Sequence, residues 1–143
     1  MAVEAVAAPV FVIIPALVMG GIIGLVELFF VHADESGLGW LGHGLHALPV
    51  TMLFVFISMN IEYVFRLLNL HITASFWVQM IVRILIGIIA MLKITGAASI
   101  APHTRIGERK VHVLIVGALV IIAPYLWDYV LVNMLPASLG GKI

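Results

Sequence analysis

Six charged side chains interrupt otherwise apolar stretches of this chain, and they are the residues that could do chemistry inside a membrane. They are Glu27, Glu62, Arg66, Arg83, Lys93 and Asp128. A charge in hydrocarbon costs about 2.5–3.5 kcal/mol on insertion scales, so such residues pair with one another or line a pathway for ions or protons. Three are acids and three are bases, which favours mutual pairing over a pore of one charge sign.

The spacing of these six residues predicts two clusters. A helix with 3.6 residues per turn places Glu62 and Arg66 on one face, with the acid first, which is the favourable order for a pair. A rise of about 1.5 Å per residue places Glu27 and Lys93 near one membrane surface and the other four in the opposite half. We therefore expect Glu27 to pair with Lys93 and the other four to form one cluster.

Three histidines form a candidate metal site: His32, His43 and His46. His43 and His46 are three residues apart, so they share one helical turn if their helix begins early. Imidazole nitrogens, with carboxylate oxygens from Asp34 or Glu35, suit Zn, Cu, Fe or Ni. A bound divalent metal is thus a hypothesis, although the HExxH pattern is absent. No other cofactor is predicted.

Signatures of catalysis are otherwise absent from the sequence. There is no GxSxG, no Walker A loop and no dinucleotide fingerprint. The chain has no cysteine, which excludes disulfides, thiolate metal sites and thiol catalysis. The formal net charge is zero, so nothing indicates a nucleic-acid partner. These absences favour a protein that is not an enzyme.

Four long apolar runs must position these residues. They cover about 9–32, 48–69, 73–93 and 111–134. Each matches the stretch of about 20 residues that crosses a bilayer, and 64% of the chain is hydrophobic against about 45–50% in ordinary globular domains. The 143 residues therefore predict one all-α domain, a four-helix transmembrane bundle with short loops in a lipid bilayer. The first run is longer than a signal-peptide core, so we expect a retained helix.

Each predicted helix has one face of small or polar residues, which we expect to point into the bundle. On the first helix, Ala16, Gly20 and Gly24 form a small-xxx-small pattern that permits close packing, within the chain or between two copies. The corresponding faces of the other helices are Thr51, Ser58, Glu62, Arg66 and Asn69, then Ser75, Gln79, Arg83, Ala90 and Lys93, then Gly117, Tyr125 and Asp128.

Prolines and aromatic residues add local expectations. Pro15 and Pro124 fall within apolar runs, and each should bend its helix because it frees the carbonyl four residues earlier. Four aromatic residues near span ends are expected to anchor the chain at the membrane surface. They are Tyr63, Trp77, Trp127 and Tyr129.

Four spans place both termini on one side of the membrane. The connection near 70–72 is short and predicts a tight hairpin, whereas the loops expected at 33–47 and 96–110 lie on the other side. Basic residues mark the cytoplasmic side. Lys93, Arg105, Arg109 and Lys110 lie near the second side, against Arg66 and Lys142 near the first. This imbalance favours a multi-pass protein of the cell membrane with both termini outside.

Three hypotheses for function follow. The first is a non-enzymatic subunit of a homo-oligomer or larger membrane complex, associating through the small-residue face of the first helix. The second is a small ion channel or proton-coupled transporter in which the intramembrane charges, Glu62, Arg83 and Asp128 above all, carry conduction or coupling. The third is a component of a membrane metalloenzyme with the histidine site at one membrane face.

Overall fold

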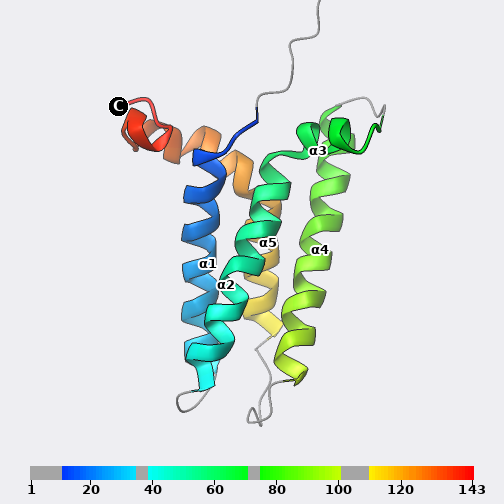
Figure 1. Ribbon diagram of the computed structural model, residues 1–143, viewed down its shortest axis with the longest axis vertical. Coiled ribbons are helices and arrows are strands. Elements are labelled where there is room, and N and C mark those ends of the chain that lie inside the picture. Colours follow the sequence, from blue (N-terminus) through cyan, green and yellow to red (C-terminus); the bar gives the residue numbers. More distant parts are fainter. Residues whose placement is uncertain (1–10, 35–38, 71–74, 101–109) are drawn as a thin grey trace, which may run out of the picture.

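Four long helices form the protein (Figure 1). The computed structural model describes residues 11–34, 39–70, 75–100 and 110–143. The helices are α1 (Ile14–Asp34), α2 (Gly39–Met59), α4 (Phe76–Ile100) and α5 (Lys110–Tyr129). Each is long and apolar enough to cross a membrane, and the described residues contain no strand. The predicted all-α fold with four spans is confirmed, and the chain is a small polytopic membrane protein.

Helices α2 and α5 occupy the middle of the bundle, with α1 and α4 on either side. Helix α1 packs on α2 and α5, and α4 packs on the same two helices. Figure 1 shows that the chain enters α1 at the end where the C-terminus lies, and the short helix α3 (Ile61–Leu67) is at this end too. We call it the termini end. The opposite end, where α1 leads to α2 and α4 leads to α5, is the loop end.

An apolar core fills the space between the four helices. Its buried residues are Met19, Ile23, Val55, Ala90, Ile94, Val113, Val116, Val120, Ala123 and Trp127. Every long helix carries large exposed apolar side chains on its outward face. Because lipid is as apolar as these side chains, the exposed faces suit a bilayer environment and require no further protein cover.

Helix α2 begins at Gly39, so the predicted loop over 33–47 is wrong from that residue onward. Gly44 of this helix serves packing, because a Cβ atom there would overlap the Leu28 side chain of α1. Close packing offsets the roughly 1 kcal/mol that glycine costs inside a helix. Pro49, the second residue of the predicted span over 48–69, consequently lies inside α2.

The last two spans also differ from their predicted bounds. Helix α4 continues to Ile100, past the predicted end at 93, and Thr95 is accommodated because its Oγ1 donates to the Met91 carbonyl at 2.8 Å. Helix α5 stops at Tyr129 instead of reaching 134. Two short 3₁₀ turns follow, η1 (Leu131–Asn133) and η2 (Ala137–Leu139).

Two local expectations need correction. Pro15 is the second residue of α1, where a proline is tolerated, so it does not bend that helix. Trp127 is only 5% exposed and belongs to the core, whereas Trp77 and Tyr129 are 72% and 78% exposed, as surface anchors should be. Trp127 turns inward because α5 presents Ala123 and Trp127 on its buried face.

Candidate binding pocket

A break in the second predicted span organises the termini end. Asn60 separates α2 from α3, with backbone angles of φ −115° and ψ 30° that no helix interior uses. Its side chain is 3% exposed and binds the backbone ahead of α1. Asn60 Nδ2 donates to the Val12 carbonyl at 3.0 Å, and Val12 N–H donates to Asn60 Oδ1 at 2.8 Å. The single predicted span over 48–69 is therefore two helices, and Asn60 fixes the entry to a third.

The break frees a carbonyl that a buried cation then uses. In an unbroken helix the Ser58 carbonyl would accept the Glu62 N–H. The backbone bonds at the break instead go to Phe56 and Ile57, and the Ser58 carbonyl accepts Arg83 Nε at 3.3 Å. The break between α2 and α3 thus provides the carbonyl that holds Arg83 in place.

Arg83 lies inside the bundle and is held by neutral groups. It is 8% exposed and about 10 Å along α4 from Phe76 at about 1.5 Å per residue. Its Nη1 donates to the Tyr125 hydroxyl at 3.1 Å, and its Cζ lies 5.4 Å from the centre of the Tyr125 ring. A cation over an aromatic face is attracted by the ring quadrupole. Tyr125 therefore orients the guanidinium without neutralising it.

A second released carbonyl binds α2 to α5. Pro124 has no N–H, so the Val120 carbonyl four residues earlier lacks its helical donor. Ser58 Oγ, which is fully buried, donates to this oxygen at 2.7 Å. The Ser58 side chain thus donates to the Val120 carbonyl, and the Ser58 carbonyl accepts a hydrogen bond from Arg83. The defects in α2 and α5 compensate each other at the same level of the bundle.

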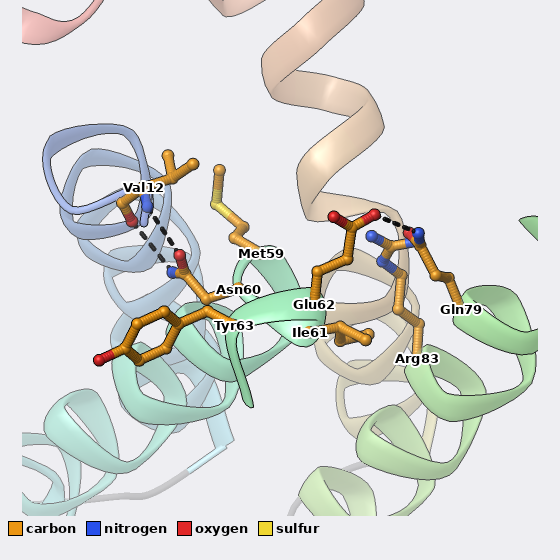
Figure 2. Close-up of a pocket in the computed structure, with 8 residues that line it drawn as sticks. All are labelled: Val12, Met59, Asn60, Ile61, Glu62, Tyr63, Gln79 and Arg83. Atoms are coloured by element: carbon orange, nitrogen blue, oxygen red, sulfur yellow. Dashed lines mark hydrogen bonds between the residues drawn. The ribbon is translucent and has the colours of Figure 1, made fainter. Parts of the chain in front are cut away.

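These residues border an open pocket of about 190 Å³ at the termini end. Its lining comes from the segment before α1, the α2–α3 break and α4: Val12, Met59, Asn60, Ile61, Glu62, Tyr63, Gln79 and Arg83. Figure 2 shows the carboxylate of Glu62, the amide of Gln79 and the guanidinium of Arg83 gathered on one side of the pocket, with the Val12–Asn60 bonds on the other. Gln79 Nε2 donates to Glu62 Oε1 at 2.7 Å.

The positive charge of Arg83, which we call the floor of the pocket, has no acidic partner among the described residues. No carboxylate oxygen of the described residues lies within 4.0 Å of the Arg83 guanidinium. Two of its five N–H groups are used, by Ser58 and Tyr125, and Nη2 donates to no described group. A guanidinium edge with free donors is suited to a carboxylate or phosphate, which it binds through two parallel hydrogen bonds.

The expected four-residue cluster is only half assembled. Glu62 and Arg83 meet at the pocket, although through Gln79 and shared lining instead of an ion pair. Arg66 and Asp128 are exposed, and neither side chain makes a hydrogen bond or ion pair with any described residue. The helix break explains this, because Glu62 and Arg66 lie beyond it on α3 instead of deep in a continuous span.

The pair expected at the opposite side is not formed. Glu27 is 1% exposed, about 10 Å inward from the end of α1 at Asp34. Lys93 is exposed on α4, and no ion pair joins it to Glu27 in the described part of the chain. The extension of α4 to Ile100 leaves Lys93 inside a helix instead of at its end.

The small-residue stripe of α1 packs against α2. Ala16, Gly20 and Gly24 are all buried. A Cβ atom at Gly20 would lie 3.2 Å from Met52 Cα, and one at Gly24 would lie 3.3 Å from Leu48 Cγ. These contacts support the alternative that the stripe packs within the chain, and association of this face with another subunit stays a prediction.

The histidines lie on two elements at the loop end. His43 and His46 both belong to α2, which begins early enough to include them. The ring of His32 lies edge-on to that of Trp40, with the ring centres 4.5 Å apart. Among the described residues, no three His, Asp or Glu side chains are placed to share a metal ion. Glu35 lies outside the described residues, and metal binding stays a prediction.

One polar contact at the loop end involves a histidine outside that predicted set. His112 Nδ1 lies 2.7 Å from Asp34 Oδ2, and the imidazole stacks on Phe30 with ring centres 4.2 Å apart. The contact joins the last residue of α1 to the first turn of α5. It closes the loop end of the bundle across two helices that are distant in sequence.

Asn60 is the pocket residue that sequence reasoning missed. Ser58, Gln79 and Tyr125 fall on the predicted polar faces, but Asn60 was assigned no role. Its signal is a single amide in an apolar run, and such a residue favours local backbone bonds over a helix interior.

No protein family, curated protein or solved structure matches this chain in the three comparisons made. A functional conclusion must therefore come from the side chains of the site itself.

Proposed function

We propose that this polytopic membrane protein is a small transporter, without enzymatic activity, that binds an anionic group of its substrate at Arg83. Arg83 is the residue on which the proposal depends. It is buried within a membrane-spanning helix, held by a carbonyl and a hydroxyl, and borders a pocket, and its Nη2 donates to no described group. A charge in this position is costly and marks a substrate or ion site by default.

The two interrupted helices support a transport role. Substrate sites of transporters commonly form where helices are discontinuous near the membrane interior. Here the break at Asn60 and the proline at Pro124 lie at one level, joined through Ser58. Each leaves the helical hydrogen-bond ladder incomplete. Each is therefore a place where the helical segment on the side of the termini end can pivot.

The apolar core below the pocket argues against a permanently open channel. Met19, Ile23 and Val55 are each at most 1% exposed and lie in one packed cluster with α5. An ion cannot pass such a layer without losing its hydration. Passage therefore requires the helices to move, and this favours a carrier over a pore.

Uptake into proteoliposomes tests the proposal. The probes are radiolabelled inorganic phosphate, O-phosphoethanolamine and β-alanine, compared in wild type, Arg83→Gln and Arg66→Gln. We expect wild type to take up at least one probe and the uptake rate of Arg83→Gln to be at least tenfold lower. Arg66→Gln is the matched control, because Arg66 is exposed at the same end of the bundle. Uptake of none of the probes, or equal uptake by Arg83→Gln, would reject the proposal.

A second candidate function, subunit of a homo-oligomer or larger membrane complex, is favoured by Lys93. This cation is exposed on α4, about 25 Å from Phe76, and α4 is the least covered of the four spans. An acidic group from a neighbouring subunit would neutralise it. Lys93→Gln removes this charge, and Lys142→Gln is the control because Lys142 is an exposed cation outside the four spans. Loss of oligomeric mass or of a co-purified subunit in Lys93→Gln alone supports association through α4, and an unchanged assembly contradicts it.

For membrane placement we propose a cell membrane with both termini outside, on the balance of basic residues described above. A cysteine added at the C-terminus, labelled with a membrane-impermeant maleimide in intact cells, tests this. Labelling without lysis supports the orientation, and labelling only after lysis reverses it.

The third hypothesis, a metalloenzyme component, requires a bound metal. Calorimetric titration with zinc or copper in detergent compares wild type with a His43→Ala, His46→Ala variant. Equal affinity in the two proteins rejects the histidine site.

A further inference from the structure

We propose, resting on the transporter site above, that the substrate is a small zwitterion whose anionic group binds Arg83 and whose ammonium group binds Glu62. The chemical class is an ammonium joined by a short methylene chain to a phosphate or carboxylate.

The pocket presents two opposite charges that do not neutralise each other. Arg83 contributes a guanidinium edge at the floor, and Glu62 contributes a carboxylate at the exposed rim. Their charged atoms are more than 4.0 Å apart, since they form no ion pair. Figure 2 shows both side chains directed to the same part of the pocket. The space between them suits a molecule that carries both charges.

Each charged group keeps binding capacity toward that space. Arg83 Nη2 donates to no described residue, and Glu62 accepts a hydrogen bond from Gln79 at Oε1 only. Gln79 therefore holds the carboxylate in place and leaves Oε2 for a donor. An ammonium group with three N–H donors is the complement of that oxygen.

The rest of the pocket fits the remainder of such a molecule. Met59 and Ile61 supply apolar lining between polar walls, and this suits a methylene spacer. Asn60 does not compete for the ligand, because its amide is engaged with Val12 and Phe56. The volume of about 190 Å³ is below the roughly 300–1,000 Å³ of sites for drug-sized ligands, so the ligand is small or enters by a headgroup only.

Charge balance distinguishes a zwitterion from a simple ion. The described lining of the pocket carries one positive and one negative side chain, so a plain anion meets repulsion from Glu62 and a plain cation meets repulsion from Arg83. Only a ligand with both charges gains from both walls. Glu62 is therefore a specificity-determining residue, and Arg83 is the primary anchor.

Calorimetric titration of the purified full chain in detergent at low salt tests this. The probes are O-phosphoethanolamine and β-alanine, with inorganic phosphate and ethanolamine as the separate halves of the first. We expect wild type to bind one zwitterion at least tenfold more tightly than either half. Glu62→Gln should remove that preference and raise the affinity for phosphate, whereas Arg83→Gln should abolish binding of all anionic probes.

Matched controls separate charge at the pocket from charge elsewhere. Asp128→Asn removes an exposed acid at the same end of the bundle, and Arg66→Gln removes an exposed base there. Both should bind as wild type does. Because Glu62 is exposed, Glu62→Gln remains informative even if Arg83→Gln fails to fold.

The outcomes distinguish this inference from the transporter proposal. Phosphate binding as tight as zwitterion binding, unchanged in Glu62→Gln, overturns the zwitterion and leaves the anion site intact. No binding of any probe, or binding that folded Arg83→Gln retains, overturns both. Repeating the titration in nanodiscs separates the two sources: weaker binding in phosphatidylethanolamine than in phosphatidylglycerol indicates a lipid headgroup, and equal binding indicates a free solute.

Discussion

Ser58 Oγ donates a 2.7 Å hydrogen bond to the Val120 carbonyl, the oxygen that Pro124 leaves without a helical donor. Both groups are buried. This bond explains how a proline is tolerated inside a membrane-spanning helix, since a neighbouring helix satisfies the freed carbonyl.

Ser58→Ala should therefore destabilise the protein by about 1–3 kcal/mol, the cost of leaving a buried acceptor unsatisfied. Chemical unfolding in detergent measures this loss. In a Pro124→Ala background the alanine N–H regains the Val120 carbonyl, so the same substitution should cost much less. Equal losses in the two backgrounds would show that the serine acts in some other way.

Replacing Gly20 by leucine should unfold the α1–α2 pair, because a Cβ atom there already lies 3.2 Å from Met52 Cα. Gly21→Leu is the control, since a Cβ atom at Gly21 has nothing within 4 Å. We expect a clear fall in melting temperature for the first variant and little change for the second, at unchanged oligomeric mass. A Gly20→Leu protein that keeps its stability but loses an oligomer would place the stripe at a subunit interface instead.

Asn60→Ala should release the segment ahead of α1. The substitution removes both bonds to Val12, so hydrogen exchange of the Val12 amide should accelerate strongly, with a stability loss of about 1–3 kcal/mol. Asn133→Ala serves for comparison, because that amide makes one exposed 3.4 Å bond to Tyr129. Unchanged exchange at Val12 in the first variant would mean that other contacts hold the segment.

Two tryptophans should differ in their contact with lipid. In a protein whose sole tryptophan is Trp77, which is 72% exposed, lipids with brominated chains should strongly quench the fluorescence. A protein retaining only Trp127, 5% exposed, should be quenched weakly because the bundle shields the ring. Comparable quenching would contradict the inward placement of Trp127.

Composition and run length were enough to predict the four spans, because only a helix can carry such stretches through a bilayer with its backbone bonds satisfied. The inward position of Arg83 was also predictable, since an arginine in a long apolar run has few other places to go. The residues at which the helices begin and end were harder to predict from the sequence. Gly44 reads as a loop residue in isolation and becomes a packing residue only when Leu28 of α1 lies against it.

The site was predicted only in part, for a physical reason that lies at Asn60. One asparagine in an apolar run is compatible with an unbroken helix, and its preference for a break is decided by distant contact with Val12. A rise counted along an unbroken span predicts Glu62 and Arg66 within one charged cluster, and their i, i+4 spacing predicts a pair. With the break in place, Glu62 bonds to Gln79 and Arg66 is exposed.

Nitrogen NMR of arginine side chains tests whether the Arg83 guanidinium binds an anion. The full chain, labelled with ¹⁵N-arginine in nanodiscs and titrated with inorganic phosphate, reports each guanidinium separately once Arg83→Gln has assigned its signals. We expect saturable shifts of the Arg83 Nη signals and none for exposed Arg66. Arg83 signals that stay in place, or that move only in parallel with those of Arg66, would contradict an anion site in this pocket.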